Sequence, residues 1–386
     1  MKILHIITGL DNGGAEGVLY RLITGDDQNN HFVISLMDEG VFGERFVIAG
    51  ITVHTLYMPR GCVKIKGIIK LYQLIRKIRP DVIQTWMYHA DLIGGVVARV
   101  ARVKAIVWGI RNSNLDDLYT SLSTRFVVKF CALASGWIPR RIIFNSGRSV
   151  DFHVEKGYAH HKVVLIPNGF NYVQLSPNNS ERVKLRKELG IDQNDVLLGM
   201  VARWDPQKDH VNLVAALGLL KSRTDYFVKV ILVGPGITND NSDLVAMLDL
   251  YGVTSRVKLI GPRNDISRVM NALDLHILSS RFGEAFPNVL AESMVCGTPC
   301  VSTDVGDAAL ILSNLGWIVL PNDSVSLADA ISLALFEKQN EPHAWESRKA
   351  ACRQRIVENF SLEKMVSAFR QVWNDVSTEV MNSKQN

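Results

Sequence analysis

The stretch SSRFGEAFPNVLAESMVCGTPCVSTD, residues 279–304, contains a complete strand–loop–helix–strand succession. An apolar strand ends near Ser279. Pro287 suits the first turn of the following helix, because it lacks an N–H that would be left unpaired there. Gly297 ends the helix, and a second apolar strand, Pro299–Val301, follows at once. This order predicts two parallel strands joined by a helix.

The same alternation extends over the whole chain. In the first half we predict strands at Ile3–Ile7, Phe32–Leu36, Val82–Trp86, Ala105–Trp108, Arg141–Phe144 and Val163–Ile166. Helical periodicity is found between them at Ala15–Ile23, Lys66–Ile78, Asp91–Val100 and Thr124–Ala134. In the second half we predict strands at Val196–Val201, Lys229–Val233, Val257–Ile260, Leu275–Leu278, Pro299–Val301 and Trp317–Val319, with a mostly helical tail from Leu327 that includes Leu362–Val376. The fold class is therefore α/β with two Rossmann-like domains, and ligands of such domains bind at the carboxyl ends of the strands.

Turn-forming residues mark the boundary between the two halves. Pro167-Asn168-Gly169 and the segment 176–180 interrupt the alternation, so we predict domains over residues 1–170 and 171–360. Residues 361–386 form the last segment, and its final residues, Ser383–Asn386, are expected to fray.

Composition limits the classes of function. Of 386 residues, 47% are hydrophobic and 21% charged, which is typical of a globular protein. The net charge of +5 is concentrated in the first half, which suits anionic lipid or phosphate-bearing substrates. No recognised nucleic-acid motif is present. The apolar start of the chain is too short for a signal peptide, and no run has the length of a transmembrane helix, so membrane contact is expected to be peripheral.

The five cysteines do not form a metal-binding pattern. Their number is odd, no C-x-x-C occurs, and no histidines cluster near them. We expect buried thiols in a reducing cytoplasm, and no metal site.

The helix after Pro287 predicts a phosphate site. The first amides of a helix carry partial positive charge, so Asn288, Val289 and Leu290 are expected to bind a diphosphate. Ionised carboxylates only accept hydrogen bonds, which suits sugar hydroxyls. We therefore assign Glu284 to a hexose and Glu292 to a ribose. The alternative is that Glu284 complements the helix dipole and Glu292 is solvated.

Two further groups lie directly after predicted strands. Arg203 and Lys208 follow a buried strand, where preorganised cations stabilise a departing diphosphate; the alternative is a surface pair. Gly13 and Gly14 permit close approach of the backbone to phosphate. The run from Gly234 lacks the third glycine of a dinucleotide fingerprint, which argues against a nicotinamide cofactor.

These motifs resemble retaining glycosyltransferase family 4, which has the GT-B fold, of the type found in bacterial polysaccharide and O-antigen biosynthesis. The resemblance covers nearly the whole chain. It is carried by Gly13-Gly14-Ala15-Glu16, His89 after Gln84-Thr-Trp-Met-Tyr, Asn168-Gly169, Arg203-Trp-Asp-Pro-Gln-Lys208 and the two glutamates Glu284 and Glu292. The sequence departs from the family at Ala202, Asp209 and Ala285, where glycine is common.

The resemblance implies a site and a reaction. The first domain is expected to bind the acceptor and the second the nucleotide sugar across a central cleft, with the last helix returning to the first domain. Catalytic roles fall on His89, Arg203, Lys208 and Glu284. The donor-binding set is Gly13, Gly14, Arg203, Lys208, Arg263, Glu284, Phe286, Pro287, Asn288, Val289, Leu290 and Glu292. The donor is expected to be UDP-linked. No metal and no cofactor are expected, because the nucleotide sugar is a substrate.

The acceptor is expected at the membrane. Residues 64–79 are basic with apolar residues at helical spacing, and Arg99, Arg102, Lys104, Arg125, Lys129, Arg140 and Arg141 extend the charge. This face would rest on anionic lipid at the inner side of the cell membrane; the alternative is an ordinary helix packed on its sheet. A lipid-diphosphate-linked saccharide would suit it, with Arg111 and Asn112 binding the acceptor.

Two rival functions remain at this point. One is a nucleotide-sugar epimerase of the same fold, whose product would form without an acceptor. The other is a non-catalytic, membrane-associated assembly subunit, for which replacing Arg203 or Glu284 would leave the cell's glycan unchanged.

Overall fold

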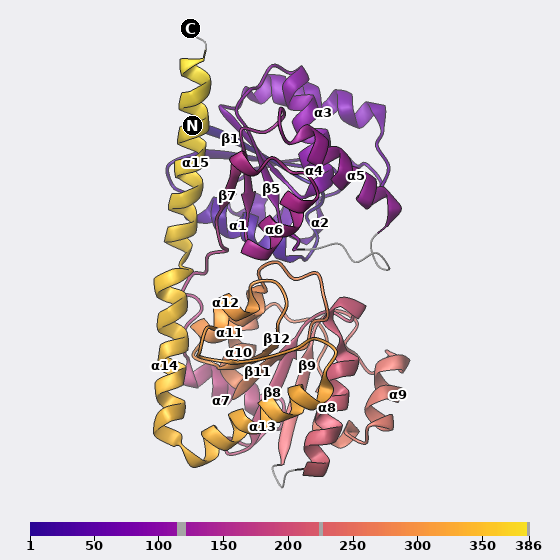
Figure 1. The fold of residues 1–386 in the computed structure, drawn as a ribbon, viewed down its shortest axis with the longest axis vertical. Helices are drawn as coiled ribbons and strands as arrows, with labels where there is room; N and C mark the ends of the chain where they lie inside the picture. The colour runs from indigo at the N-terminus through magenta and orange to yellow at the C-terminus, as the bar shows by residue number, and fades with distance from the viewer. Residues whose placement is uncertain (114–120, 224–226, 384–386) are drawn as a thin grey trace. The chain divides into compact units, whose positions relative to one another are not determined.

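The computed structural model describes residues 1–113, 121–223 and 227–383. The chain divides into two compact units, and each is described by itself. Unit 1 comprises Met1–Gly169 and Leu362–Asn386, and unit 2 comprises Phe170–Ser361 (Figure 1). The expected fraying of residues 384–386 lies outside the described residues.

Unit 1 is built on a parallel sheet of seven strands in the order β3-β2-β1-β4-β5-β6-β7. The strands are β1 Lys2–Ile7, β2 Asn30–Ser35, β3 Thr52–Thr55, β4 Val82–Trp86, β5 Ile106–Ile110, β6 Arg141–Phe144 and β7 Val163–Leu165. β1 and β4 are buried almost throughout, as expected for strands covered on both faces.

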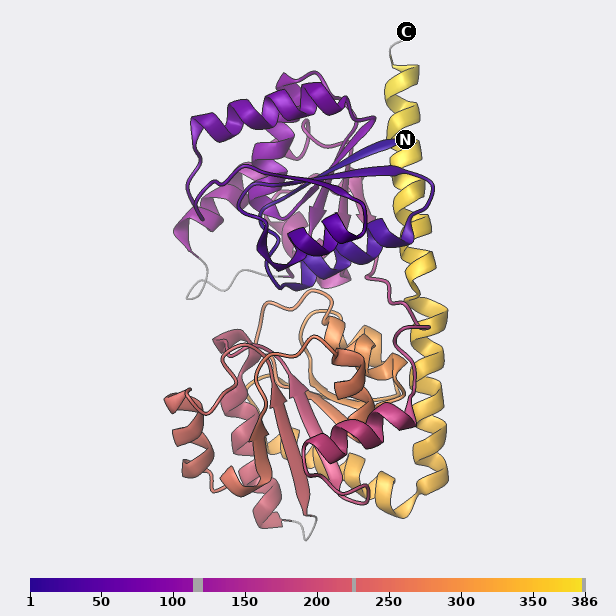
Figure 2. The same ribbon diagram turned by 180° about the vertical axis from the view of Figure 1, so that it is seen from behind.

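Helices cover both faces of this sheet. Those of unit 1 are α1 Gly14–Gly25, α2 Gly40–Ile48, α3 Ile65–Ile78, α4 Tyr88–Val100, α5 Leu122–Ala134, α6 Gly147–Glu155 and α15 Leu362–Asn382. One core cluster lies under α3, α4 and α5, and another under α1, α2 and α15. Figure 2 shows α15 alongside the sheet of unit 1, and it packs against α1 and β4.

Unit 2 repeats this plan with six parallel strands in the order β10-β9-β8-β11-β12-β13. The strands are β8 Val196–Val201, β9 Val228–Val233, β10 Val257–Leu259, β11 Leu275–Leu278, β12 Cys300–Thr303 and β13 Trp317–Val319. The helices are α7 Asn179–Glu188, α8 His210–Arg223, α9 Ser242–Leu250, α10 Ile266–Ala272, α11 Asn288–Val295, α12 Ala308–Leu312, α13 Ser324–Asn340 and α14 Pro342–Asn359.

The strand order reverses at one place in each sheet. In unit 1 the reversal falls between β1 and β4, and in unit 2 between β8 and β11. Doubly wound sheets bind ligands at such switch points, beyond the carboxyl ends of the two strands. The expected α/β fold class is confirmed, and most of the predicted site residues follow these four strands; Arg263 follows β10 instead, and Arg111 and Asn112 follow β5.

Several elements differ from the expectation. The edge strand β3, Thr52–Thr55, was not predicted, because its four residues contain no apolar run and only Thr55 is buried. α4 begins at Tyr88 rather than Asp91, which places His89 in a helix. α11 begins at Asn288, so Pro287 is its N-cap rather than a first-turn residue. Cys62 is exposed, contrary to the expected burial, because it lies in the loop before α3; the other four thiols are buried. No described helix is both long and apolar enough to cross a membrane.

Candidate functional site

The switch point of unit 2 contains a buried charge pair. Lys208 ends the short 3-10 helix Pro206–Lys208 after β8, and its ammonium forms an ion pair with the Glu284 carboxylate. The Ser280 hydroxyl donates to the same carboxylate oxygen at 2.9 Å. The two charged side chains are only 14% and 10% exposed. Residues 76 positions apart are thus joined beyond the ends of the two strands that flank the switch point.

Two hydrogen bonds to backbone carbonyls hold the same loops together. The Ser279 hydroxyl donates to the Lys208 carbonyl at 2.9 Å, and the Arg281 amide donates to the Gln207 carbonyl at 2.7 Å. The loop after β12 also packs here, because a Cβ on Gly306 would lie 2.3 Å from the Glu284 carbonyl. Lys208 and Glu284 are therefore held by a rigid backbone.

Asp209 occupies a position where the resembling family commonly has glycine. Its φ of 48° is left-handed, a conformation that aspartate tolerates better than most residues. Its carboxylate accepts the Asn212 amide at 3.2 Å at the start of α8. The departure from glycine therefore leaves this residue in a glycine-like conformation.

Two histidines near Lys208 are neutral. Burial, followed by repulsion from Lys208, lowers the pKa of His276 to about 3. The same two causes, in the same order, lower the pKa of His210 to about 4. Neither histidine was singled out in the sequence, because a lone histidine gives no signal of its neighbours. The Lys208 ammonium is therefore the dominant positive charge of this group near pH 7.

Arg203 lies in the same loop but points elsewhere. Its Nε donates to Asp205 at 3.0 Å and its guanidinium reaches Gln207 at 3.3 Å, while the side chain stays 53% exposed. Arg263 is held by Asp265 at 2.7 Å and Glu188 at 2.8 Å. The structure thus joins Lys208 with Glu284, whereas Arg203 and Arg263 are paired with other carboxylates.

At the start of α11 the side chains are largely buried, which leaves mainly the backbone for contacts with a ligand. The Phe286 ring packs on Phe170 and Phe360, with centroids 6.2 Å and 5.3 Å away, and Leu290 is fully buried. The Leu290 amide donates to the Pro287 carbonyl at 3.1 Å, so this amide is used within the turn rather than left unpaired as expected. Val289 is partly buried against the same core, and Glu292 is half-buried. Any ligand contact of Phe286 must therefore come from its main chain, whereas Leu290 has a buried side chain and an amide already bonded within the turn.

The switch point of unit 1 contains the two predicted glycines. Gly13 is the N-cap of α1, and Gly14 is its first residue. A Cβ on Gly13 would lie 2.3 Å from the Glu16 carboxylate, which folds back over the loop. Burial raises the pKa of Glu16 to about 7. This loop therefore carries a carboxyl group that is half-protonated near neutral pH.

His89 follows the other strand of this switch point. Its helix begins after Met87, whose φ of 70° is unusual for a residue with a side chain. Burial, and then the Arg60 charge, lower the pKa of the half-buried His89. Asp91 lies one turn into the helix, accepts from the Thr85 hydroxyl at 2.5 Å, and has a pKa raised by burial to about 8. His89 is thus presented neutral, on a turn held by strained backbone.

Arg111, predicted to bind the acceptor, is largely enclosed. Its guanidinium stacks on Trp86 at 4.5 Å and donates to the Asn168 side chain at 3.0 Å. Asn112 is exposed, and its carbonyl accepts from Ser149. Arg111 therefore contacts the Asn168-Gly169 turn that ends the first part of unit 1.

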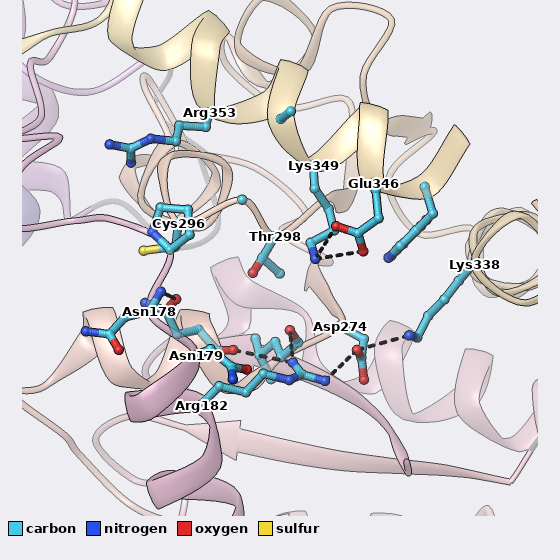
Figure 3. A pocket seen from close by; sticks show the side chains of 16 residues that line it. Asn178, Asn179, Arg182, Asp274, Cys296, Thr298, Lys338, Glu346, Lys349 and Arg353 are labelled. Atoms are coloured by element: carbon cyan, nitrogen blue, oxygen red, sulfur yellow. Dashed lines mark hydrogen bonds and ion pairs between the residues drawn. The ribbon is translucent and has the colours of Figure 1, made fainter. Parts of the chain in front are cut away.

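A pocket of about 520 Å³ lies in unit 2 at the opposite ends of the strands from the Lys208–Glu284 pair (Figure 3). Its charged groups are paired: Asp274 bonds Arg182 at 2.9 Å and Lys338 at 3.3 Å, and Lys349 bonds Glu346 at 3.0 Å. Asp274 directly precedes β11, so this pocket is at the amino ends of the strands. It is distinct from the Lys208–Glu284 pair. In the described part of the chain, no group of three or more His, Cys, Asp or Glu side chains is placed to hold a metal ion.

Comparison with known proteins gives a consistent result for both units. The protein-family model described as Glycosyl transferases group 1 matches residues 181–351, and the family model described as Glycosyltransferase Family 4 matches residues 12–173. The solved structure of Anabaena Alr3699/HepE in complex with UDP-glucose is 26% identical, with a TM-score of 0.82, and the match covers 98% of this chain and all of that one.

Two curated relatives extend the comparison. The chain is 24% identical over 335 residues to the UDP-Gal:alpha-D-GlcNAc-diphosphoundecaprenol alpha-1,3-galactosyltransferase of Escherichia coli, covering 84% of each chain. It is 22% identical over 393 residues to the putative glycosyltransferase EpsF of Bacillus subtilis (strain 168), covering 98% of this chain and 97% of that relative.

Two doubly wound sheets of this order are the fold of a GT-B glycosyltransferase. The chain belongs to glycosyltransferase family 4.

Proposed function

We propose that this glycosyltransferase moves a hexose or N-acetylhexosamine from a UDP-sugar to a lipid-linked saccharide, with retention of anomeric configuration, in the synthesis of a cell-surface glycan. The observation that carries the proposal is the ion pair of Lys208 and Glu284, with Ser280 on the same oxygen, at the switch point of unit 2. The UDP donor is supported by the UDP-glucose complex of the similar Anabaena protein. The acceptor class is supported by the name of the Escherichia coli relative.

Lys208 is assigned to the leaving diphosphate. When the bond between the anomeric carbon and the phosphate oxygen breaks, negative charge grows on that oxygen, and a fixed ammonium stabilises it. Arg203 is assigned to the same diphosphate, which it reaches by leaving Asp205; its exposure leaves that side chain room to turn. The backbone at the start of α11 contributes the helix dipole, and Gly13 and Gly14 permit close approach of the phosphates.

Glu284 and His89 are assigned to the transferred sugar. Glu284 accepts hydroxyl hydrogen bonds, and its ion pair with Lys208 holds the carboxylate in place. Neutral His89 bonds a sugar hydroxyl and adds no positive charge beside the cationic anomeric centre. Glu292 is assigned to the ribose, and Arg263 and Phe286 border the nucleotide. We further assign Arg111 and Asn112 to the acceptor side.

The proposed step balances without a cofactor or metal. An acceptor hydroxyl attacks the anomeric carbon on the face that UDP leaves, the carbon–oxygen bond to UDP breaks, and the hydroxyl proton passes to the departing phosphate oxygen. The arginine, the lysine and the helix amides supply the electrostatic stabilisation that a metal ion gives in other enzymes.

The decisive experiment is an assay of purified protein with a panel of nucleotide sugars and a diphosphate-lipid-linked monosaccharide. We expect UDP release that depends on the acceptor, and an NMR spectrum of the product in which the anomeric configuration of the donor is kept. An inverted product would remove the retaining assignment.

The same assay separates the rival functions. Donor incubated alone tests for an epimerase, which would yield a new nucleotide sugar. The protein would be an assembly subunit if it were inactive with every donor and if a Glu284→Gln variant left the cell's glycan unchanged. The peripheral position at the inner face of the membrane belongs to this proposal as well.

A further inference from the structure

The outward side of α5 carries an apolar stripe. Five large side chains recur at spacings of four, four, three and four residues, and each is between 57% and 71% exposed. We call them the α5 ridge: Leu122, Phe126, Phe130 and Leu133 on α5, with Trp137 three residues after its end. The other side of α5 is already occupied, because Val128, Cys131 and Ala132 belong to the core of unit 1. A helix on the surface of a protein normally turns polar residues outward, so this helix has an unpartnered second apolar face.

Neighbouring helices also expose apolar side chains. α4 packs against both α5 and α3 (Figure 1). Val96 and Val100 are exposed one turn apart on α4, and Ile65 and Ile69 are exposed one turn apart on α3. The main apolar stripe of α3, in contrast, is buried in the core. The hydrophobic part of this face is therefore centred on α5, which sequence patterning had not singled out.

Cations gather at the Trp137 end of the ridge. Arg99 donates to the carbonyls of Trp137 and Ile138 at 2.6 Å and 3.0 Å, and Lys162 donates to the Pro139 carbonyl at 2.8 Å. Burial, and then repulsion from Arg99, Arg140 and Arg141, lower the pKa of Lys162. Within residues 1–113, 121–223 and 227–383, no carboxylate forms an ion pair with Arg99, Arg140 or Lys162. Their positive charge is thus concentrated and, in the part of the chain that the structure describes, not paired with a carboxylate.

We propose that the α5 ridge inserts into the interfacial layer of a bilayer containing anionic lipid, with lipid phosphates facing Arg99, Arg140 and Lys162. Apolar side chains at helical spacing enter such a layer, and nearby cations add attraction to the charged headgroups. A second copy of this chain fits the ridge less well, because it would bring like charges together. The inference rests on the proposed lipid-linked acceptor and names the surface that holds the enzyme at the membrane.

Vesicle binding tests the proposal directly. The test variant is Phe126→Ser/Phe130→Ser, and the matched control is Leu333→Ser/Phe336→Ser on α13, which removes two exposed apolar side chains from unit 2. Co-sedimentation with vesicles of phosphatidylglycerol and phosphatidylethanolamine should weaken by about tenfold or more for the test variant. The control should bind like the unchanged protein, and vesicles of phosphatidylcholine should bind all three weakly. Melting temperatures show that each variant folds.

Three outcomes overturn the proposal. The first is unchanged binding of Phe126→Ser/Phe130→Ser to the anionic vesicles. The second is equal loss in the control variant. The third is a dimer in sedimentation velocity that this variant converts to monomer while vesicle binding persists, which would make the ridge a contact between copies.

A separate measurement isolates this inference from the proposed function. UDP release from the donor is measured for the unchanged protein and for Phe126→Ser/Phe130→Ser with the diphosphate-lipid-linked acceptor dispersed in detergent and without vesicles. Equal rates with lost vesicle binding support the ridge as a membrane contact. If the unchanged protein releases no UDP with any donor, the proposed function fails, and the vesicle result still decides the role of the ridge.

Discussion

The two units have the same strand order around their switch points but place opposite kinds of chemistry there. In unit 2 the loops after β8 and β11 bring together full charges, Lys208 and Glu284. In unit 1 the first turns of the helices after β1 and β4 carry groups that burial moves towards neutrality, namely Glu16, with a pKa of about 7, and His89, with a lowered pKa. A shared fold therefore does not dictate a shared role. We assign the charges of unit 2 to the diphosphate and the sugar, and the neutral His89 of unit 1 to the sugar.

The largest expected effect is at Lys208. Lys208→Ala removes the buried ammonium and should lower kcat by about 10²–10³-fold, because one preorganised group facing a developing anion contributes that much. Acceptor-dependent UDP release measures the loss. Lys221→Ala, which removes an exposed lysine of α8, should keep full activity. Equal activity in the two variants would end the assignment of charge chemistry to unit 2.

A smaller loss is expected at His89. His89→Ala should lower kcat by about 10²-fold, with a smaller change in KM for the donor, because a group that acts on the transition state affects kcat. His343→Ala, on the exposed side of α14, is the control. Since burial lowers the His89 pKa, the imidazole should stay neutral, and kcat should hold, as the pH falls to its ordinary pKa of about 6.5. A loss of rate centred at that pH would contradict the neutral role.

Glu16 should affect stability through pH. Its pKa is near 4.5 in the unfolded chain and about 7 in the folded one, so the folded state holds the extra proton between these values. Stability from this group is therefore full below pH 4.5 and is lost as the pH rises to 7. Glu16→Gln should match the unchanged protein at low pH and exceed it above pH 7 by up to about 3 kcal/mol. Thermal melts at several pH values measure this difference in stability, and Glu44→Gln, at an exposed position of α2, is the control. A pH-independent difference would show that Glu16 does not titrate as stated.

The smallest effect is expected from removing metal ions. Arg203, Lys208 and the backbone of α11 are proposed to stabilise the leaving group, so a chelator should leave the transfer rate unchanged. The rate is compared before and after dialysis against the chelator, and again after magnesium or manganese is added back. Loss of activity that either metal restores would show that the cations of unit 2 are insufficient.

Most of the fold could be predicted from the sequence, because buried parallel strands are apolar runs. Strands such as Val82–Trp86 and Val196–Val201 were predicted to the residue. β3 was missed because an edge strand needs no apolar run, and α4 was predicted three residues short because Met87 begins it with positive φ rather than with a capping side chain. Apolar patterns in a sequence indicate which residues are buried. The start of a helix such as α4 and the position of an edge strand such as β3 depend on backbone geometry instead.

The site was predictable only as a set of positions. Motif spacing placed Lys208 and Glu284 after their strands, and the structure adds their direct contact. The neighbouring neutral imidazoles and the turn of Arg203 towards Asp205 could not be read from spacing. The outward apolar side of α5 was hidden as well, because helical periodicity does not tell which of two apolar faces meets the core. These features depend on which side chains tertiary packing encloses.

The composition of unit 1 has a consequence for synthesis on the ribosome. Its second core cluster contains Phe369 and Trp373 of α15, both fully buried, and the Trp373 indole donates to Gln84 at 3.3 Å. Unit 2, residues 170–361, leaves the ribosome before these side chains do. Unit 2 is thus completed first, and the face of the unit 1 sheet that α1, α2 and α15 cover lacks α15 until translation is almost over. A premature stop codon that removes only α15 would leave unit 1 with that face incompletely covered.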